Sequence, residues 1–331
     1  MSNNQTKYSK IDEYGFERPE NFNYQAYEEF MSEYFRVLAR RSKRWEDYND
    51  IHKLKKSKTL KRFIRKGIPI SKRPVVWMST SGALLLKEAS SVTYAEVRSS
   101  IQISMITEMI EIDLPRTFPD NIYFTSDSQL PRQLYNILAS FAQQNTEVGY
   151  CQGLNYIAGL LLLATKSEEV TFWLLKALIE NILPKYYVKN MSGLLTDMAV
   201  LDELVRIREP AVHRHITRIG MPWAVTTTKW FICIYAEVLP VETVLRIWDC
   251  LFNEGSKIIF RVALTLIRMH REEILETTEL GEIVDCFKKM TKSSKVVNCH
   301  DFMQAIFKLP GKMTNAEIAQ LRRKHKNAGA K

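Results

Sequence analysis

Residues 241–252 read Val-Glu-Thr-Val-Leu-Arg-Ile-Trp-Asp-Cys-Leu-Phe, and apolar side chains stand at positions 241, 244, 245, 248, 251 and 252. That spacing gathers them on one face of an α-helix. Similar helical patterns occur at residues 24–47, 131–144, 169–182 and 258–275. Strand-like alternation is scarce, and no repeat of fixed period stands out. The 331-residue sequence, with 12 glycines and 11 prolines, therefore predicts an all-α protein.

Residues 155–164 differ from these amphipathic segments because they are almost wholly apolar. We expect a buried helix here. The apolar run is about half as long as the roughly 20 residues that a membrane span needs. Met1–Glu20 is too polar for a secretory signal. Since the five cysteines are also scattered, as free thiols in a reducing compartment would be, we expect a cytoplasmic protein.

The net charge of +10 is concentrated in two short stretches. Residues 40–66 carry 12 basic and 3 acidic side chains, and residues 319–331 carry 5 basic and no acidic ones. The first stretch could bind the phosphate groups of a membrane or of nucleic acid, or it could be a solvated helix face whose apolar residues pack inward. It lacks the interleaved aromatic residues that base stacking needs, so we expect no specific nucleic-acid partner. Weak peripheral contact of residues 40–66 with intracellular membranes stays open.

Composition and pattern divide the chain into four parts. Residues 1–25, with Gly15 and Pro19, are expected to form a flexible N-terminus. Residues 26–62 are expected to form a helical, basic segment. A helix stop and turn at Lys66–Pro69 lie near the start of the main domain, which we place at residues 63–310. Residues 311–331 are expected to form a basic C-terminal tail.

The familiar motifs of nucleotide-binding proteins and hydrolases do not occur in the sequence. There is no GxxxxGK(S/T) phosphate loop, no GxGxxG after a strand, no HExxH and no GxSxG. There is no CxxC pair that could hold zinc. The chain has no recognisable site of an independent enzyme, and two short polar segments become the candidates for its chemistry.

The first segment is Ile110-Glu-Ile-Asp-Leu-Pro-Arg-Thr117. Pro115 fixes its own φ and disfavours helical geometry at Leu114, so we expect a helix to end just before Asp113. The stiff loop that follows would project Arg116. Asp113 could orient its guanidinium through a charge-assisted hydrogen bond. On spacing alone, an Asp–Arg ion pair of little energetic value at a helix end explains the pattern at least as well.

The second segment is Gly149-Tyr-Cys-Gln-Gly-Leu-Asn155, directly before the predicted buried helix. Its two glycines permit a tight turn that presents Gln152, or the close approach of another backbone. A plain helix-entry loop with Asn155 in a capping role explains the same residues. Pattern alone does not separate these interpretations.

Three motifs, standing in the same order, resemble the successive motifs of the TBC domain: Arg73-Pro-Val-Val-Trp77, Ile110-x-x-Asp113-x-x-Arg116-Thr117 and Tyr150-x-Gln152-Gly153-x-Asn155. Further segments resemble the later half of that domain: Trp230-Phe231, Leu239-Pro240 and Arg246–Gly255. The resemblance covers roughly residues 65–310. The flanks, including Tyr14–Pro19 and Leu239–Ile267, resemble one particular branch of the family.

This resemblance implies a GTPase-activating protein for Rab-family small GTPases, and hence an activator rather than an enzyme with a substrate of its own. It implies that Arg116 acts as an arginine finger and Gln152 as a glutamine finger, in trans, on a GTP-bound partner. The partner would carry GTP and Mg²⁺, so this chain is expected to need no cofactor or metal. Regulation of vesicle trafficking is the expected cellular role.

Six further motif residues are expected to support the two fingers: Asp113, Tyr150, Gly153, Asn155, Arg73 and Trp77. Asp113 is expected to orient Arg116, and Asn155 to brace the loop that carries Gln152. Arg73 and Trp77 are expected to contribute packing and an ion pair rather than contact with nucleotide, with Asp249 as a candidate partner for a buried arginine.

A protein of another class would carry some of the same features. A non-catalytic helical adaptor could bind a small GTPase or its effector without activating it. Such an adaptor has no need of both Arg116 and Gln152, and their joint presence favours the activator.

Overall fold

The computed structural model describes residues 9–18, 20, 22–46, 54, 56–125 and 127–326. Within them the chain forms α-helices joined by short turns. The first half contains α1 (Tyr24–Arg44), α2 (Lys58–Lys66), α3 (Arg73–Ser81), α4 (Ala83–Ala89), α5 (Tyr94–Ser99), α6 (Met105–Asp113), α7 (Leu130–Gln144), α8 (Leu154–Thr165) and α9 (Glu168–Ala177). The second half contains α10 (Ser192–Arg208), α11 (Pro210–Ile219), α12 (Trp223–Ile232), α13 (Val241–Glu254), α14 (Lys257–Met269), α15 (Arg271–Glu276), α16 (Leu280–Met290), α17 (Ser294–Val297), α18 (Cys299–Lys308) and α19 (Asn315–His325). The predicted all-α fold is confirmed.

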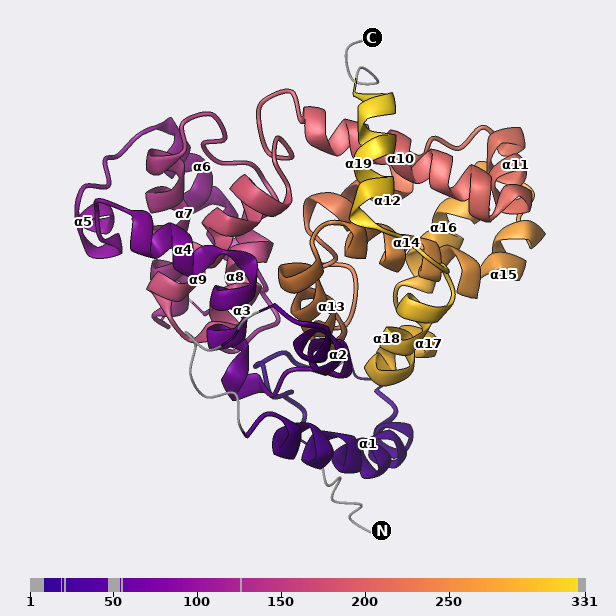
Figure 1. Cartoon of the computed structure of the whole chain (residues 1–331), viewed down its shortest axis with the longest axis horizontal. Helices are drawn as coiled ribbons and strands as arrows, with labels where there is room; N and C mark the ends of the chain where they lie inside the picture. The colour runs from indigo at the N-terminus through magenta and orange to yellow at the C-terminus, as the bar shows by residue number, and fades with distance from the viewer. Residues whose placement is uncertain are drawn as a thin grey trace.

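Helix α13 lies at the centre of the molecule. Pro240 precedes its first residue, and Gly255 ends it in a left-handed conformation (φ +81°) with its N–H bonded to the Leu251 carbonyl. In Figure 1, α3–α9 gather on one side of α13 and α10–α12 with α14–α16 on the other. Helix α1 crosses the bottom of that view, below α2. The segment with the clearest helical pattern thus joins the two halves.

The predicted buried helix is α8. Its residues from Leu154 to Thr165 are all buried except Tyr156, and it packs against α3, α7 and α9. Because α8 is surrounded by other helices, its polar entry loop is held against a rigid core. That loop is the one that carries Gln152.

Two predicted helices end differently from the pattern. The run 169–182 finishes as a π-helical turn, Leu178–Ile182, shortly before Pro184, whose ring restricts the preceding residue. The run 258–275 is divided at His270, which leaves helical geometry at ψ +26° and separates α14 from α15.

Part of the N-terminal segment packs against the rest of the chain. Residues 1–25 were expected to be flexible, yet Tyr14 is 5% exposed and Phe16 forms an antiparallel bridge with Asn121. Residues 1–8, 19 and 21 lie outside the described residues. The contacts that hold Tyr14 come from residues far along the chain, so local composition gave no sign of them.

The predicted basic tail also begins as an ordered element. Residues 315–325 form α19, opened by a capping box between Thr314 and Glu317. Arg322 donates two hydrogen bonds, of 2.7 and 2.6 Å, to Asp197 of α10. Part of the tail's positive charge therefore serves internal packing. Residues 327–331 lie outside the described part of the chain.

Candidate functional site

Arg116 stands at the end of a single turn of 3-10 helix that continues α6. Asp113 is the last residue of α6, and residues Leu114–Arg116 form the turn η3. The α-helix ends at Asp113, close to its expected end, but Leu114 keeps helical angles (φ −56°, ψ −50°), so a 3-10 turn follows instead of the expected loop. Hydrogen bonds from Thr117 to Asp113 and Leu114 hold the turn, and they outweigh the disfavoured angles of a residue that precedes proline. Pro115 stiffens a turn rather than a loop.

The guanidinium of Arg116 is exposed and paired. Its side chain is 58% exposed, and Nη2 contacts a carboxylate oxygen of Asp113, as predicted from the three-residue spacing. The other oxygen of Asp113 accepts a 2.6 Å hydrogen bond from the Tyr150 hydroxyl. Burial and this bond raise the pKa of Tyr150 above its ordinary value, so the hydroxyl stays protonated and donates. Asp113 is itself 5% exposed, which makes it a fixed anchor for Arg116.

Gln152 lies on an exposed turn between two glycines with positive φ. Gly149 has φ +58° and Gly153 has φ +110°, backbone angles that residues other than glycine rarely adopt. The Gly153 N–H donates a 3.0 Å bond to Oδ1 of Asn155. Asn155 therefore braces the turn from within the first turn of α8, and Gly153, not Asn155, is the N-cap residue of that helix.

Hydrogen bonds tie the turns that carry Arg116 and Gln152 to each other. One is the bond from Tyr150 to Asp113, a second is a 2.8 Å bond from Nδ2 of Asn155 to Oγ1 of Thr117, and a long third runs from the Tyr156 hydroxyl to the Arg116 carbonyl at 3.4 Å. Since Asn155 is 1% exposed and Thr117 is also 1% exposed, water competes little for the second bond. We call these two linked turns the finger site.

Thr117 is a residue of the finger site that sequence reasoning did not single out. It donates to the Asp113 carbonyl at 2.8 Å and accepts from Asn155, so it connects both turns. The signal in the sequence was its place directly after Arg116 in the second motif. Its role could not be deduced there, because its partner lies 38 residues away.

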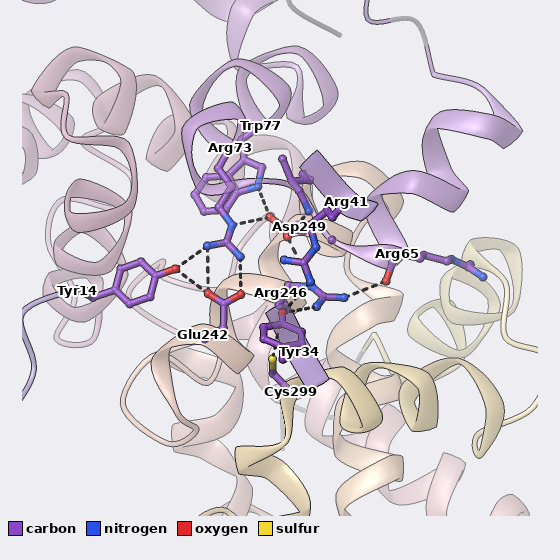
Figure 2. A network of polar contacts seen from close by, with 12 residues as sticks. Tyr14, Tyr34, Arg41, Arg65, Arg73, Trp77, Glu242, Arg246, Asp249 and Cys299 are labelled. Carbon is purple, nitrogen blue, oxygen red and sulfur yellow. Dashed lines mark hydrogen bonds and ion pairs between the residues drawn. The ribbon is translucent and has the colours of Figure 1, made fainter. Parts of the chain in front are cut away.

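Arg73 and Trp77 make their polar contacts elsewhere, in a buried network drawn in Figure 2. We call it the central polar cluster, formed by Tyr14, Tyr34, Arg41, Arg73, Trp77, Glu242, Arg246, Asp249 and Cys299. The structure thus brings Asp113, Tyr150, Gly153 and Asn155 together around the fingers and leaves Arg73 and Trp77 in the core.

Asp249 is the partner of the buried arginine. Its Oδ1 lies 3.2 Å from Nε of Arg73 and accepts a 2.9 Å bond from the Trp77 indole. Burial opposes the charge of Arg73, but Asp249 and Glu242 outweigh it and raise the pKa of Arg73 well above its ordinary value. Both side chains are fully buried, and burial raises the pKa of Asp249 although Arg73 opposes this shift. The pair joins α3 to α13.

The central polar cluster also holds the N-terminal elements. The Tyr14 hydroxyl donates to Glu242 at 2.6 Å and accepts from Arg73 at 2.8 Å. The Tyr34 hydroxyl of α1 accepts from Arg41 at 2.7 Å and from Arg246 at 3.3 Å. Figure 2 shows these side chains converging from the N-terminal segment, α1, α3 and α13. The cluster is buried and structural, whereas the side chains of Arg116 and Gln152 at the finger site are exposed.

Comparison with known proteins covers both the finger site and the central polar cluster. The family model of the Rab-GTPase-TBC domain matches residues 71–275, which include Arg73, both finger turns and Asp249. The chain belongs to the TBC domain family. The resemblance predicted from three ordered motifs is confirmed.

Curated relatives of this TBC protein match nearly its whole length. Growth hormone-regulated TBC protein 1 of Homo sapiens is 50% identical over 315 residues, covering 95% of this chain and 94% of that one. Growth hormone-regulated TBC protein 1-A of Danio rerio is 47% identical over 317 residues, covering 95% and 89%. These are the relatives that the flanking segments, including Tyr14–Pro19, led us to expect.

Solved structures carry the same fold. The Chlamydomonas flagellar RabGAP TBC domain superposes with a TM-score of 0.78 at 33% identity, covering 90% of this chain and 99% of that one. The Ypt/Rab-GAP domain of Gyp1p superposes with a TM-score of 0.67 at 21% identity, covering 81% and 97%, a likeness of fold. Among the described residues of the TBC protein, no helix is both long and apolar enough to cross a bilayer.

Proposed function

We propose that this TBC protein is a GTPase-activating protein for GTP-bound Rab-family GTPases, and that it supplies Arg116 and Gln152 in trans. The observation that carries the proposal is the finger site: an exposed arginine and an exposed glutamine on two turns that hydrogen bonds link to each other. Through this activity the protein would regulate vesicle trafficking.

Arg116 has the properties that phosphoryl transfer asks of an activator. The transition state spreads negative charge over the equatorial oxygens of the transferred group, and a guanidinium supplied in trans accelerates the reaction by about 10³–10⁵. A guanidinium carries five N–H donors, and the contact with Asp113 engages one nitrogen. Arg116 can therefore keep its anchor while it meets a phosphate.

Gln152 suits the second task, which is to orient the attacking water. A side-chain amide both donates and accepts hydrogen bonds, so it can hold a water in line with the bond that breaks. The brace from Asn155 to Gly153 limits the motion of the turn that presents this amide. GTP and Mg²⁺ would be carried by the partner, since this sequence has no phosphate loop.

Single-turnover GTP hydrolysis by a panel of GTP-loaded Rab proteins tests the proposal. We expect this chain at catalytic concentration to accelerate hydrolysis markedly for a subset of the panel. If it binds GTP-loaded Rab proteins but accelerates none, the protein is a helical adaptor instead. If it neither binds nor accelerates any, the Rab partner itself is wrong.

We also propose a weak membrane contact through residues 40–66. The end of α1 and α2 lie together, with the Arg44 guanidinium 5.7 Å from the centre of the Phe63 ring. They expose a set of basic side chains: Arg40, Lys43, Lys58, Arg62 and Lys66. Lys61 and Arg65 instead pair with Glu254, and residues 47–53 and 55 lie outside the described residues.

Each basic side chain near an anionic leaflet contributes about 1 kcal/mol of binding. We therefore expect cosedimentation with phosphatidylserine vesicles that weakens steeply with salt, and none with neutral vesicles. If an Arg40→Glu, Lys43→Glu, Arg62→Glu variant sediments as the wild type does, these basic side chains do not bind the membrane and form a solvated helix face.

A further inference from the structure

Helix α6 carries an unusual exposed apolar surface. Four large apolar side chains within ten residues are open to solvent: Ile103 (89% exposed), Met105 (80%), Met109 (50%) and Ile112 (65%). Ile103 and Met105 are the two most exposed large apolar residues in the described part of the chain. A concentration of this kind marks an interaction site far more often than scattered surface leucines do.

The three helical members form a single stripe. Met105, Met109 and Ile112 are spaced i, i+4 and i+7, so at about 100° per residue they lie within roughly 60° of arc. Ile110 and Thr107, on the inner side of α6, are buried. The helix is therefore apolar on its outer face as well as on its inner face, which its own fold does not require. We call Ile103, Met105, Met109 and Ile112 the α6 stripe.

The α6 stripe lies beside the finger site. Asp113, which holds Arg116 and Tyr150, stands about 80° around the helix from Met105. Ile106, about 100° from Met105, faces the turn of Gln152: its Cδ1 would lie 3.3 Å from a Cβ placed on Gly149. One edge of the stripe thus borders the residues that anchor both fingers.

The other edge of the stripe is polar. Glu108 and Glu111 are exposed and lie about 60° and 120° from Met105 on the side away from Asp113. An apolar strip with a charged border has the composition of a protein–protein interface, with an apolar core and a polar rim. The exposed carboxylates on this edge argue for a folded protein partner rather than for insertion into lipid.

The position of the α6 stripe relative to Arg116 indicates which partner would cover it. At 1.5 Å per residue, Met105 lies about 16 Å along the helix from Arg116. A folded GTPase domain is wider than this distance. If its bound nucleotide contacts Arg116, the domain therefore either covers the α6 stripe or leaves a gap above it. We propose, resting on the function proposed above, that the α6 stripe is the docking surface for an apolar patch of the GTP-bound GTPase, adjacent to its nucleotide site.

The test separates docking from catalysis. In the triple variant Met105→Gln, Met109→Gln, Ile112→Gln, a polar side chain of similar helix propensity replaces each exposed apolar one. Using the Rab protein that responds best to the wild-type chain, we expect the activator concentration for half-maximal rate to rise at least about tenfold. The rate at saturation should stay within about twofold of wild type, because Arg116 and Gln152 are untouched.

A matched control is available on the other half of the molecule. Ile207 on α10 is 55% exposed and Leu280 on α16 is 47% exposed, and both helices lie across the molecule from α6 (Figure 1). The Ile207→Gln, Leu280→Gln variant should keep the wild-type half-maximal concentration. Melting temperatures of all variants exclude misfolding, and the single variant Met105→Gln serves if the triple variant is unstable.

Each other outcome overturns the inference in its own way. An unchanged half-maximal concentration, with wild-type activity present, rejects the α6 stripe while the proposed function stands. A loss of saturated rate without a change in half-maximal concentration rejects docking at this surface. A wild-type dimer that the triple variant converts to a monomer makes a second copy the occupant. A wild-type chain inactive on every Rab protein rejects the proposed function, and the docking surface with it.

Discussion

Asp113 is the residue that holds Arg116, the proposed arginine finger. It is nearly buried, and its two oxygens are divided between Arg116 and Tyr150. A buried carboxylate with a fixed hydroxyl donor cannot turn away, so it holds the exposed guanidinium near one orientation. Arg116 is thereby ordered before any partner arrives.

Replacing Asp113 by Asn should reduce the saturated rate of GTP hydrolysis by about tenfold, less than Arg116→Ala does. The amide keeps its shape and can accept from Tyr150, but it no longer attracts the guanidinium as a charge. Single-turnover hydrolysis at saturating activator measures the effect, with Tyr150→Phe as the milder companion. A wild-type rate in Asp113→Asn would reduce the Asp113–Arg116 contact to a surface ion pair.

The sequence revealed residues whose partners are near in the chain and missed those whose partners are distant. The Asp113–Arg116 pair spans three positions and was predictable from spacing. Arg73 and Asp249 are 176 positions apart, and their pairing could be suggested only by the need of a buried arginine for an acid. The role of Tyr14 had no local signal at all.

At the scale of elements, Glu254 joins three helices. It ends α13 with a 2% exposed side chain that contacts Lys61 and Arg65 of α2 and Lys257 of α14. Burial raises the pKa of Glu254, but hydrogen bonds and charge attraction from Arg65 and Lys61 outweigh it and lower the pKa to about 2. Part of the basic stretch 40–66 therefore serves this internal contact rather than an outside partner.

The sign of the pH dependence follows from that shift. A carboxyl with a folded-state pKa of about 2 and an ordinary value of 4.5 adds stability above pH 4.5 and loses it as the pH falls toward 2. We expect Glu254→Gln to melt below wild type at pH 7, with a difference that shrinks as the pH is lowered. A difference in melting temperature that is constant from pH 7 to pH 3 would contradict the low pKa.

Element boundaries were predicted best where apolar periodicity coincided with a stop signal. Helix α13 was expected over residues 241–252 and spans Val241–Glu254, ended by Gly255. The α-helix before Pro115 ends at Asp113, close to its expected end, but a 3-10 turn held by hydrogen bonds from Thr117 replaces the expected loop. Rules for the residue before proline describe a local preference, which tertiary and side-chain contacts can override.

In the whole molecule, the central polar cluster joins the N-terminal segment to the central helix α13. Tyr14 and Glu242 are 228 positions apart, and their hydroxyl–carboxylate bond attaches the N-terminal segment to α13. Burial raises the pKa of Tyr14 well above its ordinary value, so the hydroxyl remains a donor at every physiological pH. Tyr14, which lies in the segment expected to be flexible, is therefore packed into the fold.

Tyr14→Phe should lower the free energy of unfolding by about 1–3 kcal/mol, because it leaves Arg73 and Glu242 each without one buried hydrogen bond. Urea denaturation measures this, and Tyr123→Phe, on a ring that is 46% exposed, is the control. The saturated rate of GTP hydrolysis should not change, since the cluster does not include the fingers. A stability equal to wild type would mean that water replaces the lost hydroxyl.

In the proposed mechanism, this chain provides both catalytic side chains for its partner's GTP. The sharpest experiment is single-turnover hydrolysis with a responding Rab protein whose own catalytic glutamine is replaced by alanine. We predict that wild-type activator still accelerates this Rab variant, and that Arg116→Ala and Gln152→Ala each remove most of the acceleration while melting as wild type does. If the Rab variant no longer responds to the wild-type activator, while Gln152→Ala acts normally on the unaltered Rab protein, the water is oriented by the partner and the glutamine finger is contradicted.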